Sequence, residues 1–334
     1  MTSSQDFNKA PTVDDIHAAA RTLQGKAVRT RLLESPLLNK RMGGRILVKP
    51  ECLQRTGSFK FRGAYNKVSN LTKEESAGGV IAFSSGNHAQ SVAAAAGLCG
   101  LPAVIVMPED APAIKMQNTK ALGAEVITYD RFGEDREAIV DKIAAERGMA
   151  IVRPYDDRYI IAGQGTVGLE IAEDLDALGV QADAVLVPCG GGGLISGTAL
   201  ALSSVLPDTP VYGVEPEAFN DTKRSLDSGE RLANPDGLTS ICDALLSKMP
   251  GRITLPINRE LLAGALGVSD DQALAAMVTA FMDLKLVVEP GGAVALAAAL
   301  NGLVPVEGKC VVAILSGGNV DPAMFKRALD TVAP

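Results

Sequence analysis

The chain of 334 residues contains 34 glycines, two histidines and no tryptophan. Its 32 basic and 39 acidic residues give a formal net charge of −7, so no basic excess is present to neutralise phosphates, and a nucleic-acid partner is not expected. At roughly 150 residues per domain, the length favours two domains or one large α/β unit, and either can bury a substantial core.

No segment is typical of a membrane span. The most apolar candidate, Val92 to Met107, contains Gly97 and Pro102 and is shorter than the roughly 18 residues required. Residues 1–10 have no apolar run, so neither a signal peptide nor membrane association is expected. Five scattered cysteines in apolar surroundings favour a cytoplasmic protein with reduced thiols: Cys52, Cys99, Cys189, Cys242 and Cys310.

Strands and helices alternate along the chain. The first expected helix covers residues 13–23, with Thr12 as its N-cap. Short aliphatic runs predict strands at 45–49, 80–83, 103–107, 125–128, 150–153, 184–188, 211–215 and 310–315. Helices are expected at 89–97, 111–122, 135–147, 165–178, 194–205, 270–286 and 292–303, whereas 216–256 is less regular. This alternation predicts a mainly parallel sheet covered on both faces.

In open α/β sheets, ligands bind beyond the carboxyl ends of the strands. The tetraglycine Gly190 to Gly193 follows an expected strand and opens a helix, so its backbone N–H groups can converge on a phosphate; a flexible loop is the alternative. Glu215 stands 22 residues after Gly193 at a strand end, where a ribose-binding acid would lie. A nicotinamide-dependent oxidoreductase therefore stays open, although Gly-x-Gly-x-x-Gly is absent.

Lys60 lies in the segment Ser58-Phe59-Lys60, which follows the first expected strand. Ser58 is expected to cap the next helix, which would place Lys60 in its first turn. The positive end of a helix disfavours an ammonium group, so Lys60 could serve as a Schiff-base nucleophile; a solvated surface lysine is the common alternative.

The segment from Ser84 to His88 places two hydroxyls and an amide at the expected start of a helix. This predicts a donor-rich pocket for a carboxylate or phenolate, with a simple capping turn as the alternative. His88 lies three residues after Ser85, but the absence of a Gly-x-Ser-x-Gly elbow disfavours a serine hydrolase.

Two further loops carry polar groups. The carboxylates of Glu215 and Asp221, with the carbonyl of Phe219 between them, are oxygen ligands suited to a hard cation, although a solvated acidic loop is the default interpretation. The segment Ser316-Gly317-Gly318-Asn319 follows a buried strand and can present a hydroxyl to a ligand ring.

Together these loops resemble the fold-type II pyridoxal-phosphate enzymes, in particular the serine/threonine dehydratase and serine racemase family. The resemblance extends from about residue 16 to residue 321 and rests on the order of five motifs: Ser58 to Ala64, Ser84 to Gln90, Ala162 to Thr166, Gly190 to Gly193, and Ser316 to Asn319. It implies two open twisted-sheet α/β domains of the tryptophan-synthase-β-like type. Residues 1–53 and 155–334 would form the large cofactor-binding domain, and residues 54–154 the small domain with the substrate-carboxylate loop.

The resemblance also implies roles for individual residues. Lys60 would bind pyridoxal 5'-phosphate covalently and remove the Cα proton, and in racemases the serine matching Ser85 is the acid/base on the opposite face. The implied cofactor-binding residues are Phe59, Lys60, Asn87, Gly190, Gly191, Gly192, Gly193, Leu194 and Ser316. The implied substrate-binding residues are Ser84, Ser85, Asn87, His88 and Arg136. The implied metal ligands are Glu215, Phe219 and Asp221, holding Mg²⁺, Mn²⁺ or Ca²⁺.

The expected reaction is dehydration and deamination of serine, threonine or 3-hydroxyaspartate to a 2-oxo acid and ammonia, by a homodimer. An amino-acid racemase of the same family is the alternative. The segment Ile241-Cys242-Asp243-Ala244 departs from the family's usual Ile-Ala-Asp-Gly, which puts simple serine or threonine specificity in doubt. A second substrate carboxylate would need a cation, which Arg136 could supply, although a surface ion pair is its ordinary role.

Overall fold

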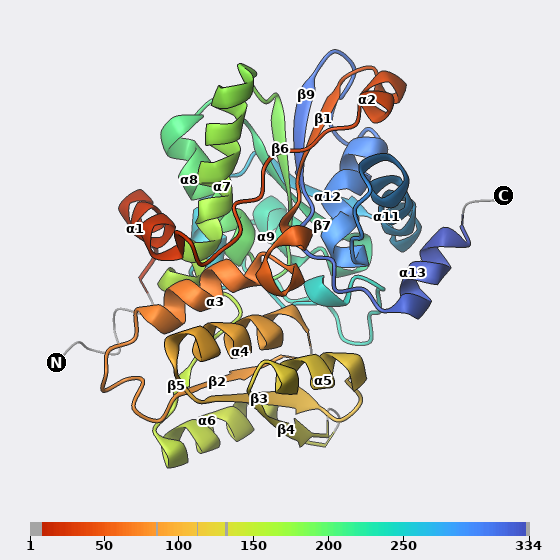
Figure 1. The fold of residues 1–334 in the computed structure, drawn as a ribbon. Helices are drawn as coiled ribbons and strands as arrows, with labels where there is room; N and C mark the ends of the chain where they lie inside the picture. Colours follow the sequence, from red (N-terminus) through yellow and green to blue (C-terminus); the bar gives the residue numbers. More distant parts are fainter. Residues whose placement is uncertain (1–8, 85, 112, 131–132, 332–334) are drawn as a thin grey trace.

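The structure is a computed structural model that describes residues 9–331 apart from residues 85, 112, 131 and 132. Figure 1 shows two α/β units, one built around the five-stranded sheet and a smaller one built around the four-stranded sheet. Among the described residues, no helix is both long and apolar enough to span a bilayer.

The strands form two parallel sheets. One has the order β1-β9-β6-β7-β8 and the other the order β4-β3-β2-β5. The first contains β1 (Arg45–Lys49), β6 (Ala184–Pro188), β7 (Val211–Pro216), β8 (Gly264–Val268) and β9 (Cys310–Ile314). The second contains β2 (Val80–Phe83), β3 (Ala103–Pro108), β4 (Glu125–Tyr129) and β5 (Ala150–Ile151). All pairings between these strands are parallel, which confirms the predicted α/β class.

Helices cover both sheets. Those of the first unit are α1 (Val13–Leu23), α2 (Pro36–Met42), α7 (Arg158–Leu178), α8 (Gly193–Val205), α9 (Asp221–Ser228), α10 (Thr254–Leu261), α11 (Asp270–Leu284), α12 (Pro290–Leu300) and α13 (Pro322–Leu329). Those beside the second sheet are α4 (Asn87–Cys99), α5 (Ala113–Ala121) and α6 (Arg136–Arg147). Helix α3 (Lys60–Ser69) packs against both α4 and α7, so it joins the two units.

Glycines allow α7 to approach its neighbours closely. A Cβ on Gly163 would lie 2.6 Å from the carbonyl oxygen of Arg62 in α3, and one on Gly165 would lie 2.8 Å from that of Gly197 in α8. The motif Ala162 to Thr166 therefore lies inside a helix, where its glycines permit close helix packing. Because Asp157 caps this helix through two backbone N–H groups, α7 begins before the predicted residue 165.

Most predicted elements are confirmed, including α1, in which Thr12 and Asp15 form a capping box. The elements that sequence reasoning missed are short: α2, α9, α10, α13 and β8. Strand β8 has the sequence Gly-Ala-Leu-Gly-Val, which lacks the β-branched run typical of a strand and lies at the edge of its sheet. The strands of the second sheet all lie within residues 54–154; the domain boundaries themselves stay a prediction.

Candidate active site

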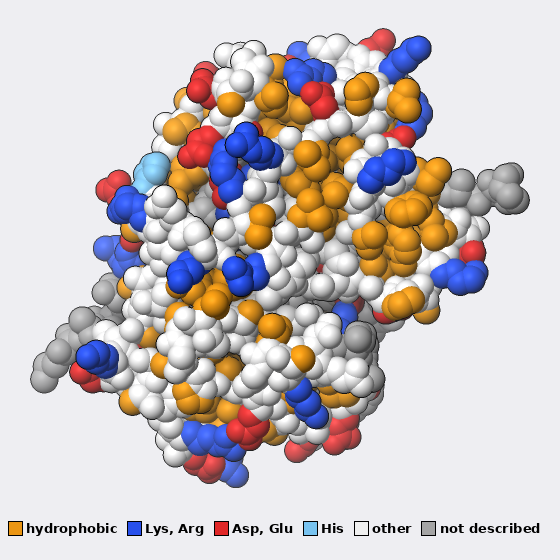
Figure 2. All heavy atoms as spheres, viewed as in Figure 1, with side chains coloured by type: hydrophobic (Ala, Val, Ile, Leu, Met, Phe, Trp, Pro, Cys, Tyr) orange, Lys and Arg blue, Asp and Glu red, His pale blue; other side chains and the backbone are white. Residues whose placement is uncertain are grey.

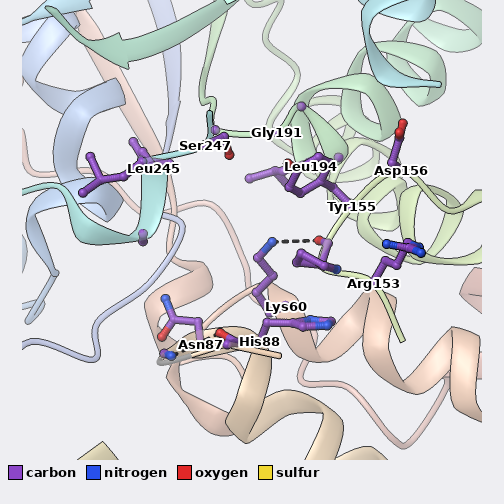
Figure 3. A pocket seen from close by; sticks show the side chains of 18 of the residues that line it. Lys60, Asn87, His88, Arg153, Tyr155, Asp156, Gly191, Leu194, Leu245 and Ser247 are labelled. Carbon is purple, nitrogen blue, oxygen red and sulfur yellow. Dashed lines mark hydrogen bonds between the residues drawn. The ribbon is translucent and has the colours of Figure 1, made fainter. Parts of the chain in front are cut away.

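A cavity of about 1070 Å³ lies where the loops of the two sheets meet. Strands β1, β9 and β6 are parallel neighbours in the first sheet, so their carboxyl ends lie side by side and the segments that follow them begin close together. Those segments carry Lys60, Ser316 and the tetraglycine, which are far apart in the sequence. Figure 3 shows side chains from both units directed at this space.

Twelve of the predicted site residues line the cavity: Phe59, Lys60, Ser84, Asn87, His88, Arg136, Gly190, Gly191, Gly192, Gly193, Leu194 and Ser316. Three others do not line it: Glu215, Phe219 and Asp221. Ser85 lies outside the described residues. The structure therefore brings the predicted cofactor and substrate groups together and keeps the predicted metal ligands apart from them.

Lys60 is the first residue of α3, and its side chain points into the cavity (Figure 3). Its Nζ donates a 2.9 Å hydrogen bond to the carbonyl oxygen of Pro154 and lies 5.1 Å from the centre of the Phe59 ring. Burial lowers the pKa of Lys60 to about 8, because a desolvated site disfavours the ammonium form. The lowered pKa agrees with the prediction, and burial is its cause.

The prediction that Ser58 caps α3 is wrong. Phe59 occupies the cap position, and no side chain caps the helix. The Ser58 backbone is extended and forms an isolated antiparallel bridge with Gly317, and the Phe59 N–H donates to the Ser316 carbonyl at 3.1 Å. Ser58 thus ties the lysine segment to the loop after β9. Its buried hydroxyl has no hydrogen-bond partner among the described residues.

A buried ionic network holds α3 in place. The guanidinium of Arg62, two residues after Lys60, donates to both carboxylate oxygens of Glu51, at 2.7 and 2.8 Å, and to both of Glu170, at 2.7 and 2.8 Å. Lys49 also bonds Glu170 at 2.7 Å. Burial alone would raise the pKa of Glu51, but the charge and hydrogen bonds of Arg62 outweigh it and keep that pKa below its ordinary value. The start of α3, and with it Lys60, is thereby fixed relative to β1 and α7.

The tetraglycine loop is tightly enclosed by its surroundings. A Cβ on Gly191 would lie 2.3 Å from the Tyr155 ring, and one on Gly193 would lie 2.5 Å from Oε1 of Gln164. Gly192 has a φ of 94°, which side chains rarely adopt. Both polar atoms of the Gln164 side chain are buried here without a partner among the described residues. A glycine cradle at the start of α8 fits a phosphate group, so the residues present suit the expected cofactor.

The loop after β2 leads directly into α4. Gly86 is at the N-cap position, and its N–H donates to the Ser84 hydroxyl at 3.1 Å. The first residue of the helix, Asn87, is held on both sides: its Nδ2 donates to Glu289 at 2.6 Å and its Oδ1 accepts from Asn319 at 2.7 Å. These two contacts fix the orientation of the Asn87 amide, with its Nδ2 toward Glu289 and its Oδ1 toward Asn319.

Glu289 is a cavity residue that sequence reasoning missed. It lies directly before α12 and is almost wholly buried. Burial, followed by the charge of Asp243, raises the pKa of Glu289 to about 7. A Cβ on Gly317 would lie 2.2 Å from its Oε1, so this loop glycine makes room for the carboxylate. In the sequence, the feature that could have indicated Glu289 is its position directly before Pro290, near the start of an expected helix.

His88 is held as a neutral side chain. Its Nε2 lies 2.8 Å from the Val152 carbonyl oxygen, and its Nδ1 has no partner among the described residues. Burial, together with the positive charge of Lys60, lowers the pKa of His88 to about 3. With Nε2 on a backbone carbonyl, no carboxylate on Nδ1 and so low a pKa, His88 is too weak a base for a hydrolytic triad.

Besides Lys60, six lysine and arginine residues line the cavity: Lys115, Arg136, Arg153, Arg231, Lys248 and Arg252. Arg136 begins α6, and its guanidinium lies 5.0 Å from the centre of the Phe83 ring. Sequence reasoning predicted only Arg136 among these six. Lys115 forms a 2.8 Å ion pair with Asp243, and its Nζ lies 3.9 Å from the position of a Cβ on Gly86 in the carboxylate loop. The cavity is therefore equipped for anionic ligands.

The predicted metal ligands lie around the end of β7. Glu215 is buried and accepts backbone N–H groups of Thr222 and Lys223 at 3.0 and 2.8 Å, and Asp221 accepts from Asn234 at 2.6 Å. The pKa of Glu215 is raised to about 8 and the pKa of Asp221 to about 6, and burial is the main cause in both cases. The second Asp221 oxygen is buried without a hydrogen-bond partner among the described residues, which a cation would satisfy. No group of three or more His, Cys, Asp or Glu side chains that could hold a metal ion occurs in the described part of the chain.

Comparisons with known proteins agree with this geometry. Residues 23–317 match the family described as "Pyridoxal-phosphate dependent enzyme". The chain is 45% identical to the L-threo-3-hydroxyaspartate ammonia-lyase of Saccharomyces cerevisiae, over 93% of this chain and 94% of that protein. It is 41% identical to the L-threonine ammonia-lyase of Thermotoga maritima, over 96% and 78% of the two chains. It is 40% identical to the serine racemase of Schizosaccharomyces pombe, over 93% and 95%.

Solved structures give the same result. The threonine deaminase of T.th. superimposes with a TM-score of 0.88 at 44% identity, covering 93% of this chain and 99% of that one. Maize serine racemase superimposes with a TM-score of 0.89 at 35% identity, covering 97% and 98%.

Proposed function

Because the chain belongs to the family of pyridoxal-phosphate dependent enzymes, we propose that it is an ammonia-lyase that converts a β-hydroxy amino acid to a 2-oxo acid and ammonia. The observation that carries this proposal is a desolvated lysine, Lys60, in one cavity with a glycine cradle for a phosphate. Support also comes from the relatives named ammonia-lyases, which are 41–45% identical to the chain. The fold and the family favour this cofactor over the nicotinamide alternative.

When bound, pyridoxal phosphate supplies an electron sink for negative charge at Cα of the substrate. The chain's own residues do the rest. The backbone N–H groups of Gly190 to Gly193 and of Leu194 would bind the phosphate, Phe59 would pack beside the ring, and Ser316 would face the ring nitrogen. Asn87 would donate to the phenolic oxygen from an amide whose orientation Glu289 and Asn319 fix.

Lys60 carries the cofactor and moves the proton of Cα at its Nζ. With a pKa near 8, this amine can both accept and release a proton close to neutral pH, as a general base must. The Pro154 carbonyl holds Nζ in position at 2.9 Å. Ser84 and the first turn of α4 provide donors for the substrate α-carboxylate, and we assign Ser85 and His88 to the same pocket.

For the substrate, we favour 3-hydroxyaspartate over serine and threonine. Its second carboxylate needs a cation, and Arg136 lies in the cavity without an ion pair to any described carboxylate. Two relatives named L-threo-3-hydroxyaspartate ammonia-lyase, each 45% identical, support this choice. A racemase is the second candidate, supported by the 40% identical serine racemase; it requires Ser85 to act on the face opposite Lys60.

The test is an ammonia-release assay with L-serine, L-threonine and the isomers of 3-hydroxyaspartate, together with the visible absorbance of the purified protein. Lys60→Ala should abolish both the absorbance band of the lysine-bound cofactor and ammonia release, whereas Lys120→Ala on the exposed side of α5 should preserve both. A colourless wild-type protein that takes up no cofactor would sink the proposal.

Two variants separate the finer assignments. Arg136→Ala should reduce kcat/KM for 3-hydroxyaspartate about tenfold or more and leave that for serine within about threefold, since only one substrate has the second carboxylate. Equal losses on both substrates would remove Arg136 from this role. A racemase would form D-amino acid that Ser85→Ala abolishes while ammonia release persists.

We also propose that Glu215, the Phe219 carbonyl and Asp221 hold a divalent cation such as Mg²⁺, Mn²⁺ or Ca²⁺. Two buried carboxylates near one another, one with an unsatisfied oxygen, favour a cation over a hydrogen-bonded pair. Chelation should lower the melting temperature, and added Mg²⁺ should restore it. An unchanged melting temperature after prolonged chelation would contradict the site.

A homodimer completes the proposal. Apolar side chains gather over α11 and α13 in Figure 2, where Phe281, Met282 and Leu329 are all exposed. Light scattering should give twice the chain mass for the wild type and the chain mass for Met282→Lys. A wild-type protein of single-chain mass would exclude this assembly.

A further inference from the structure

A second, smaller pocket of about 310 Å³ opens beside the main cavity. It is lined by Arg231, Arg252, Leu255, Pro256 and Arg259. Arg231 and Arg252 also line the main cavity, whereas Arg259 lines only the smaller pocket. The smaller pocket is therefore a distinct recess at the edge of the candidate active site.

Hydrogen bonds hold the Arg231 side chain and the backbone at Arg252 beside the recess. Nε of Arg231 donates to the Pro250 carbonyl oxygen at 2.6 Å. The backbone N–H groups of Arg252 and Ile253 donate to the two carboxylate oxygens of Asp156, at 2.8 and 2.6 Å. Asp156 has a φ of 60°, which is uncommon for a residue other than glycine, so the loop is held by a residue in a sparsely populated conformation. Arg259 projects from α10.

The charged groups that line the recess are all positive, and the carboxylate of Asp221, which lies outside the lining, interacts electrostatically with Arg231. No carboxylate lines it, and none of its three arginines forms an ion pair with a described residue. The nearest acid in these contacts, Asp156, already accepts a backbone N–H with each oxygen. All three arginines are exposed to solvent at the rim of the recess, so a bound anion can meet their positive charges there.

We infer that Arg231, Arg252 and Arg259 bind an oxyanion with at least two negative charges. Guanidinium groups bind phosphate and carboxylate groups in a bidentate manner, which suits both a phosphorylated ligand and a dicarboxylate. The site is separate from the phosphate cradle of the tetraglycine. A dicarboxylate bound here would be the substrate on its way to the cavity, and this alternative rests on the proposed function. A phosphorylated compound would be a second ligand of the protein, independent of the proposed function.

Calorimetric titration of the holoenzyme tests this site, because its cofactor cradle is already filled. The probes are inorganic phosphate and succinate, which has two carboxylates and no amino group to react. Wild-type protein should bind at least one of them, and Arg259→Gln should weaken that binding about tenfold or more, since one charged pair is lost. Arg327→Gln, which removes an exposed arginine of α13, is the charge-matched control and should leave binding unchanged.

The probe that binds identifies the source: phosphate indicates a phosphorylated ligand, and succinate indicates a dicarboxylate. The site is refuted when neither probe binds wild type more tightly than it binds Arg259→Gln, or when Arg327→Gln weakens binding equally. Arg252→Gln provides a second variant, and circular dichroism checks that each variant is folded. Because binding is measured without turnover, a negative result here is distinguishable from failure of the proposed reaction.

Discussion

At the scale of single residues, burial is what gives Lys60 its chemistry. An exposed lysine has a pKa near 10.4 and is almost fully protonated at neutral pH. The pKa of Lys60 is lowered to about 8 by burial, and no counter-charge is among the causes. The residue therefore holds a substantial fraction of free amine at the pH of most cells.

A pH series on the apoprotein checks this value. The free amine increases as pH rises through the pKa, so the rate of cofactor attachment, followed by visible absorbance, should rise steeply between about pH 7 and pH 9. Its midpoint should lie near pH 8. Nα-acetyl-lysine, whose only amine is that of the side chain, provides the control with the same cofactor, and its midpoint should lie near 10.4. A protein midpoint close to that of the control would show that Lys60 is not desolvated.

At the scale of elements, close helix packing positions the site. Helix α7 contacts α3 and α8 where glycines leave no Cβ between the backbones, and α3 and α8 carry Lys60 and the end of the tetraglycine. Small changes in this packing would move both groups. The glycines of α7 therefore help to position both groups.

Two helical glycines form a matched pair for this argument. Gly163→Ala places a Cβ within 2.6–2.9 Å of atoms of α3 and should lower the free energy of unfolding by about 1–3 kcal/mol. In Gly97→Ala on α4, the added Cβ meets nothing closer than 3.7 Å. This substitution should raise the free energy of unfolding by about 0.5–1 kcal/mol, because alanine has the better helix propensity. Urea denaturation measures both. Equal effects of the two substitutions would contradict the role of close approach.

At the scale of the whole molecule, the cavity is closed by contacts between the two units. Lys115 on α5 is paired with Asp243, which lies in the short helix Asp243–Leu245 beside the first sheet. Asn87 on α4 is bonded to Glu289, which is 202 residues away. The relative position of the two units thus decides whether the substrate groups meet Lys60.

Asp243→Asn tests this closure. Because the Asp243 side chain is 58% exposed, its pair contributes little stability, and the free energy of unfolding should fall by less than about 1 kcal/mol. Loss of the contact across the cavity should nevertheless raise KM about two- to fivefold in steady-state assays. Asp330→Asn, which breaks the exposed Lys326–Asp330 pair on α13, is the control and should leave KM unchanged. An equal KM for the two variants would show that the contact does not assist closure.

The sequence by itself determined the parallel α/β class, most of the elements and the segments that carry Lys60, Ser84 and the tetraglycine. Those features depend on local patterns: hydrophobic runs, capping residues and clustered glycines. Only the tertiary structure decided that Ser58 pairs with Gly317 instead of capping a helix, that Glu289 holds Asn87, and that Lys115 meets Asp243. The same holds for the arginine recess, whose members come from separate segments. The physical reason is that strand order and the burial of polar groups arise from contacts between distant segments, which no local pattern records.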